Sequence, residues 1–170
     1  MADDVVISLP VGARVLVVAN LRLRGPATAA STLAADQLAL ALSAWSGPGA
    51  VVVAGDLFDL GDLGPDAIVP ALDAHSRLRD ALKDFSAGPG RRLIVLPGLR
   101  DAGMAASPVA AATLASSIGA ELAPAAVVEL GTAAGVRAVR VEPGDPVHLT
   151  SGRSGTGTPP GYPRLTPGLC

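Results

Sequence analysis

Two aspartates, Asp56 and Asp59, follow closely on a run of valines and are the side chains best placed to do chemistry. Residues 51–53 are all valine, which is typical of a strand buried on both faces of a sheet. Gly55 ends this run just before the two carboxylates. Burying a carboxylate is costly unless a partner neutralises it, and a metal ion or an arginine can be that partner. Which of the two this chain uses decides what the site can do.

The pattern of the chain predicts three strand–helix units followed by a hairpin. Strands are expected over residues 5–8 (an edge strand), 14–19, 50–54, 92–96, 125–130 and 136–141. Helices are expected over residues 31–45, 67–85 and 108–118. Ser31 or Thr32 would cap the first helix, and Ser107 with Pro108 would open the third.

Alternating strands and helices predict right-handed crossovers and a mostly parallel main sheet. The pattern therefore predicts an α/β fold with a C-terminal hairpin, and the family resemblance described below implies that it is a layered α/β sandwich. Loops that follow parallel strands meet at one edge of the sheet, where ligands bind. Residues 20–24, 56–62 and 98–101 should accordingly lie side by side.

Composition limits the classes of function. The chain has 170 residues and a formal net charge of −2, which gives no electrostatic reason to expect nucleic-acid binding. No apolar run reaches the roughly 18 residues that a membrane span needs, and the N-terminus lacks the basic start of a signal peptide. We expect a cytoplasmic protein with one domain over residues 1–150. Residues 151–170 are rich in glycine and proline, and we expect them to be a disordered tail.

The three loops, in this order and strand context, resemble the first three motifs of the calcineurin-like metallophosphoesterases. That family carries Asp-x-His, Gly-Asp-x-x-Asp and Gly-Asn-His-Asp after its first three strands. The resemblance covers about residues 14–144 and is nearest to the subgroup of UDP-2,3-diacylglucosamine pyrophosphohydrolases. It implies a four-layered sandwich in which two divalent metal ions (Mn, Fe or Zn) activate a water against a phosphoester.

The second motif is intact, and by the resemblance Asp56 would bridge both metals. The other motifs depart from the family at five positions. In the first motif, Asn20 replaces the metal-binding Asp and Arg22 replaces the His. In the third, Leu99 replaces the metal-binding Asn and Arg100 replaces the His that assists phosphate chemistry, while Asp101 is kept. Asp145 lies where a later motif has a His. The family's Gly-His-x-His motif is absent, so the chain is short at its C-terminus relative to the resemblance.

These replacements disfavour a dinuclear metal site. Arginine has no lone pair to donate and stays protonated, so Arg22 and Arg100 cannot be ligands. Asp56 is the one good oxygen donor left at the early ligand positions, with Asn20 a weak one. Arginine pairs well with carboxylates. We therefore expect no cofactor, and we expect Arg22 and Arg100 to balance the charges of the Asp56, Asp59 and Asp101 side chains in place of metals.

Three functions remain open from the sequence. The first is a metallophosphoesterase-like domain that has lost hydrolysis and serves as a binding or structural module, with a phosphate-containing ligand, held by Arg22, Arg24 and Arg100, or a protein as partner. The second is an active metal-dependent phosphohydrolase with a partial site. The third is a truncated product whose exposed sheet edges invite self-association. His75, on the apolar face of a helix, should be half-buried and hydrogen-bonded, and His148 should lie in a solvated loop.

Overall fold

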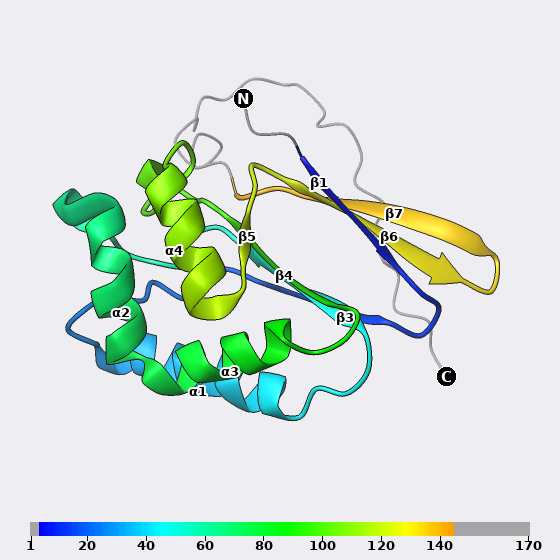
Figure 1. Ribbon diagram of the computed structural model, residues 1–170, viewed down its shortest axis with the longest axis horizontal. Helices are drawn as coiled ribbons and strands as arrows, with labels where there is room; N and C mark the ends of the chain where they lie inside the picture. The colour runs from blue at the N-terminus through cyan, green and yellow to red at the C-terminus, as the bar shows by residue number, and fades with distance from the viewer. Residues whose placement is uncertain (1–3, 145–170) are drawn as a thin grey trace, which may run out of the picture.

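The computed structural model describes residues 4–144, which form two β-sheets packed face to face with helices against one of them (Figure 1). This arrangement is a layered α/β sandwich, as the sequence predicts. Its described layers are helices, a four-stranded sheet and a three-stranded sheet. The residues expected to form a disordered tail, together with Asp145 and His148, lie outside the described part of the chain.

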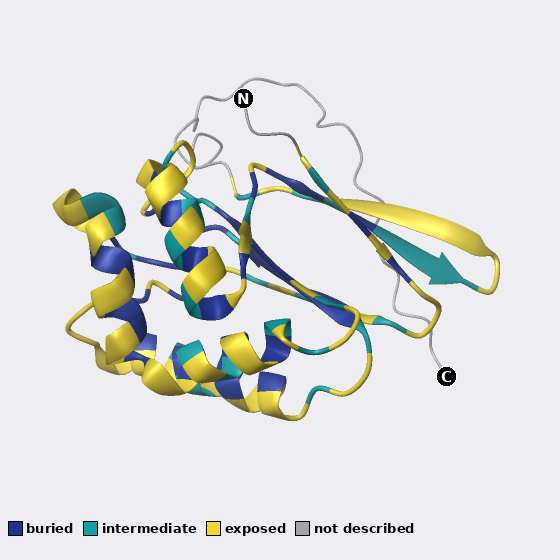
Figure 2. Ribbon diagram, viewed as in Figure 1, coloured by how far each residue is buried: buried dark blue, intermediate teal, exposed yellow. Residues whose placement is uncertain are grey.

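The main sheet is parallel and places the valine run at its centre. Its strands are β2 (Arg14–Val18), β3 (Gly49–Ala54), β4 (Arg91–Leu96) and β5 (Glu121–Leu122), in that order across the sheet. Val51 and Val53 belong to the core beneath the helices and Val52 to the core between the sheets, and all three are fully buried. Buried segments run along the middle of the main sheet (Figure 2). β3 therefore contributes to both hydrophobic cores, which explains its apolar run. The two-residue β5 was not predicted.

The second sheet has the order β1 (Val5–Leu9), β6 (Ala126–Thr132) and β7 (Gly135–Val141). β6 and β7 form the predicted antiparallel hairpin, and β1 pairs in parallel with β6 at the edge of the sheet. Ile7, Ala126 and Val128 face the main sheet and are buried. Turns at residues 10–13 and 123–125 carry the chain between the two sheets.

Four helices lie on the outer face of the main sheet: α1 (Ala29–Ser43), α2 (Ile68–Ala74), α3 (Ser76–Ser86) and α4 (Pro108–Ile118) (Figure 1). Short 3₁₀ turns cover Gly61–Ala67 and Ala102–Met104. The prediction for α4 is confirmed: the Ser107 hydroxyl accepts a hydrogen bond from the Ala110 N–H, and Gly119 ends the helix with φ +66°. No helix within residues 4–144 is long and apolar enough to cross a membrane.

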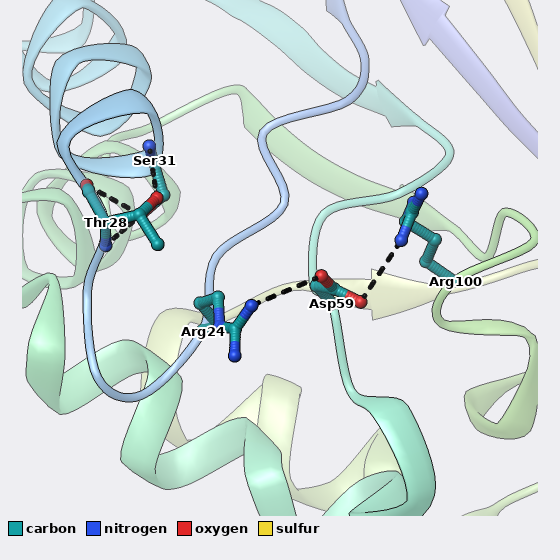
Figure 3. Close-up of polar contacts among 5 residues, drawn as sticks. All are labelled: Arg24, Thr28, Ser31, Asp59 and Arg100. Carbon is teal, nitrogen blue, oxygen red and sulfur yellow. Dashed lines mark hydrogen bonds and ion pairs between the residues drawn. The ribbon is translucent and has the colours of Figure 1, made fainter.

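Two helix predictions were wrong in detail. The cap of α1 is Thr28 rather than Ser31 or Thr32, because Ser31 is buried and completes a reciprocal capping box with Thr28 (Figure 3). The single helix expected over residues 67–85 is two helices, broken at His75, whose φ of −123° and ψ of 46° are not helical. The apolar spacing continues across the break, so periodicity alone did not reveal it.

Candidate functional site

The three loops predicted to carry the site meet at the carboxyl ends of β2, β3 and β4. They enclose a crevice of about 370 Å³. The first loop contributes Asn20 and Arg22, the second Asp56, and the third Leu99 and Arg100. The parallel order of the strands thus brings together residues that lie about 80 positions apart in the chain, from 20 to 100.

The first two loops continue the pairing of β2 with β3 beyond the strands themselves. The Asn20 N–H donates to the Gly55 carbonyl at 3.1 Å, and the Arg22 N–H donates to the Asp56 carbonyl at 3.0 Å. Leu23 and Phe58 then form a parallel bridge, and both are fully buried. The backbone beneath the crevice is therefore held by the same hydrogen bonds that hold a sheet.

Three residues of the crevice have left-handed backbone. The φ angles of Asn20, Arg22 and Asp56 are 59°, 51° and 52°. Asparagine and aspartate tolerate this conformation better than other residues with a side chain, but arginine adopts it at a cost of about 1–2 kcal/mol. Local strain of this kind collects at functional sites, where the surrounding structure holds it in place. Here the sheet-like bonds on either side hold it, and they present Arg22 and Asp56 to the same space.

The side chain of Asp56 is hydrogen-bonded to the third loop. Its Oδ1 accepts a hydrogen bond from the backbone N–H of Arg100 at 3.0 Å. Gly98 lies directly against Asp56, and a Cβ atom at Gly98 would collide with both the carboxylate and the backbone of Asp56. Glycine is needed at this position because the second and third loops approach so closely.

Asp101 is completely buried and ties the same two loops together. Its Oδ1 accepts from the Gly98 N–H at 2.6 Å and its Oδ2 accepts from the Phe58 N–H at 3.1 Å. Burial raises the pKa of Asp101, while the two N–H donors lower it in part. Within residues 4–144 no arginine forms an ion pair with Asp101, so backbone amides rather than a guanidinium stabilise this carboxylate.

Asp59 is the carboxylate that meets arginines. Its Oδ1 lies 3.5 Å from Arg100 Nη1 and its Oδ2 lies 3.9 Å from Arg24 Nη1, so it stands between the two guanidinium groups (Figure 3). The three side chains are 28–50% exposed, and ion pairs at such exposure contribute about 0–1 kcal/mol. The ion pairs therefore differ from those expected. The Arg100 guanidinium pairs with Asp59, whereas Asp56 contacts only the backbone N–H of Arg100.

Arg22 does not join this network. It lines the crevice and the adjoining hollow beside α1, and within residues 4–144 it forms no ion pair with a carboxylate. Arg24, and not Arg22 as the sequence suggested, is the first-loop arginine that pairs with a carboxylate of the site. The backbone of Arg22 is left-handed, so the spacing rule of a regular strand does not give the directions of these two side chains.

The residues present do not fit a dinuclear metal centre. In the described part of the chain no three His, Cys, Asp or Glu side chains come together. Asp56 and Asn20 line the crevice, whereas Asp59 is paired with arginines and Asp101 with buried amides. Two divalent ions held about 3.5–4 Å apart need more donors than this pair of side chains offers.

His75 lies behind the first loop rather than in the crevice. It is 5% exposed, and its Nε2 has no hydrogen-bond partner in the described structure. Burial lowers the pKa of His75, and contact with the Arg24 backbone and the charge of Asp36 oppose that shift in part. The expectation of a half-buried histidine was wrong, because His75 is almost fully buried where α2 meets α3.

Comparisons of the chain with models of protein families, with curated proteins and with solved structures found no match.

Proposed function

We propose that this chain is a metallophosphoesterase-like domain that binds a phosphate-containing anion in its crevice without hydrolysing it. The observation that carries the proposal is the convergence of Arg22 and Arg100 on one crevice at the carboxyl edge of a parallel sheet. Guanidinium groups match phosphate oxygens in geometry and charge. Ligands of small size commonly bind at such an edge, and the crevice of about 370 Å³ is large enough for a phosphate group with a small substituent.

The state of each side chain supports binding over catalysis. Arg22 has no ion-pair partner among the described residues, and the pair of Arg100 with Asp59 is long and half-exposed, so both cations are accessible to an anion. The strained backbone at Arg22 is the kind of feature that a fold retains for a ligand. Asp56 would be the main ligand for a metal in the crevice, and one of its oxygens already accepts a hydrogen bond from the third loop.

Binding is tested by titrating the full chain with inorganic phosphate and with a nucleoside monophosphate under calorimetry. We expect micromolar affinity that falls at least about tenfold, or about 1.4 kcal/mol, in Arg22→Ala and in Arg100→Ala. Arg77→Ala is the matched control, because Arg77 forms an exposed ion pair with Asp36 away from the crevice. No detectable binding by the wild-type chain would remove the proposal, and equal losses in all three variants would show binding that is only nonspecific.

The lack of hydrolysis is tested separately with bis-p-nitrophenyl phosphate and manganese. We expect no turnover above that of Asp56→Asn, and we expect elemental analysis to find manganese, iron and zinc well below one ion per chain. Metal-dependent turnover that Asp56→Asn abolishes would instead favour an active phosphohydrolase with a partial metal site. That result would overturn the non-catalytic half of the proposal while leaving phosphate binding intact.

A further inference from the structure

The outer edge of β2 presents unpaired backbone groups. β2 is the first strand in the order β2-β3-β4-β5, so one side of it has no strand neighbour within residues 4–144. The N–H groups of Arg14 and Asn20 donate toward the β3 side, to Pro48 and Gly55. Because backbone direction alternates along a strand, the N–H and C=O groups of Val15 and Val17 point outward.

An uncharged groove of about 280 Å³ runs between this edge and α1. It is lined by Leu16, Val18, Ala19, Leu21, Ala34, Gln37, Leu38 and Ala41. On the adjoining outer face of α1, Leu33 and Leu40 are 61% and 63% exposed. A helix that is apolar on its outer as well as its inner face is typical of a helix covered on both sides.

Of the other three sheet edges, those of β7 and β5 are protected. β1 carries no charged residue, but it lies in the second sheet, which no helix of residues 4–144 covers. β7 carries Arg137 and Arg140, and charged residues on an edge strand oppose pairing with another chain. β5 has only two residues. The one charged residue of β2, Arg14, stacks over the Trp45 ring at 4.7 Å and donates to the Ser46 carbonyl at 2.8 Å, so its guanidinium already has partners within the chain.

We propose that β2 pairs antiparallel with β2 of a second copy of this chain, about a two-fold axis through Leu16. In this register Val15 of one copy lies opposite Val17 of the other. Both residues direct their backbone groups outward, so they form the hydrogen-bonded type of antiparallel pair. An axis perpendicular to the sheet keeps both helical layers on the same face, so each α1 approaches its counterpart over the seam.

The chemistry of the surface selects a second copy as the occupant. Close to a two-fold axis each side chain lies near its own equivalent, so a charge there would meet a like charge. Residues 15–18 and the groove carry no charged side chain, and their surface is self-compatible for that reason. The short side chains of Ala34 and Ala41 let the two helices approach, and Leu33 and Leu40 then lose exposed area.

The test is the mass of the full-length chain in solution, measured by sedimentation velocity from low to high micromolar concentration. We expect a dimer that becomes a monomer in Val17→Pro and in Val17→Lys. Proline removes an N–H that points outward and so costs no hydrogen bond within the main sheet. Val6→Lys is the matched control, because Val6 is 55% exposed on β1 against 48% for Val17 on β2, and this variant should remain a dimer.

A second pair of variants tests the helix and keeps the experiment decisive if Val17→Pro does not fold. Leu40→Lys should raise the dissociation constant of the dimer by at least about tenfold, since it places two like charges near the axis. Val109→Lys, at the same 63% exposure on α4, should leave the constant unchanged. A wild-type chain that is monomeric at every concentration overturns the proposal. A dimer that survives both Val17→Lys and Leu40→Lys also overturns it.

Discussion

Asp56, Asp59 and Asp101 all lie at the carboxyl edge of the main sheet, and each has a different kind of partner. Asp56 accepts from the Arg100 backbone, Asp59 stands between two guanidinium groups, and Asp101 is buried against two amides. The resemblance implied a metal ligand at Asp56 and second-shell or ion-pair roles for Asp59 and Asp101. Their contacts instead join the three loops to one another, which makes the carboxylates part of the wall that shapes the crevice.

Asp101 should contribute most of the three to stability. Asp101→Ala leaves the N–H groups of Gly98 and Phe58 buried without acceptors, and we expect the free energy of unfolding to fall by about 2–5 kcal/mol. Asp101→Asn keeps one acceptor and should lose less. Asp66→Ala, at an exposed position, should change little. Urea denaturation measures all three, and an Asp101→Ala variant as stable as the Asp66→Ala control would contradict this account.

At the scale of the element, the break at His75 couples the helical layer to the crevice. His75 ends α2, precedes α3 and lies against the backbone of Arg24, which itself pairs with Asp59. The break therefore positions the first loop from behind, while the strand-like hydrogen bonds position it from the side.

The buried His75 side chain should make the stability of the protein depend on pH. Because burial lowers the pKa of His75 in the folded chain, the unfolded chain takes up a proton first as the pH falls. The free energy of unfolding should be greatest above the ordinary histidine pKa of about 6.5 and decrease as the pH falls toward the lowered value. Urea denaturation at a series of pH values, compared between wild type and His75→Gln, isolates this contribution.

The His75→Gln variant should lose the part of the decrease in stability below pH about 6.5 that is due to the histidine. His148→Gln provides the matched control because it removes the only other histidine of the chain. If the wild-type and His75→Gln curves keep the same slope in this range, then His75 is not the group that titrates.

At the scale of the whole molecule, the main sheet belongs to both hydrophobic cores. Val51 and Val53 pack against the helices, while Val52, Ile94 and Leu96 pack against the second sheet. Because the same strands serve both cores, neither layer can be lost without exposing apolar area in the other. The cooperative unit should therefore include both sheets and the helices.

We accordingly expect one unfolding transition. Fluorescence of Trp45, the only tryptophan, reports on the helical layer, and far-ultraviolet circular dichroism reports on the whole chain. The two signals should coincide in urea. Ile94→Ala, which removes a fully buried side chain from the core between the sheets, should shift both midpoints together and cost about 2–5 kcal/mol. Separate midpoints would show that the two sheets unfold independently.

Local pattern was enough to predict most of the elements and the edge at which the site lies. Strands such as 92–96, the capped helix from Pro108 to Gly119 and the hairpin follow from hydrophobic spacing and from capping and turn residues, which act over a few positions. The parallel order then brings the three loops together. The lost metal site remains a proposal, because no relative was found that would test the resemblance.

The partners of the charged side chains were decided by tertiary structure alone. Arg24 rather than Arg22 faces Asp59, Asp101 is held by amides, and the helix breaks at His75. These outcomes depend on three positive φ angles and on the close approach of Gly98 to Asp56. A contact between charged groups is made or lost over about 1 Å. Sequence spacing locates a residue on an element, but only packing between elements distant in the chain sets atoms to that accuracy.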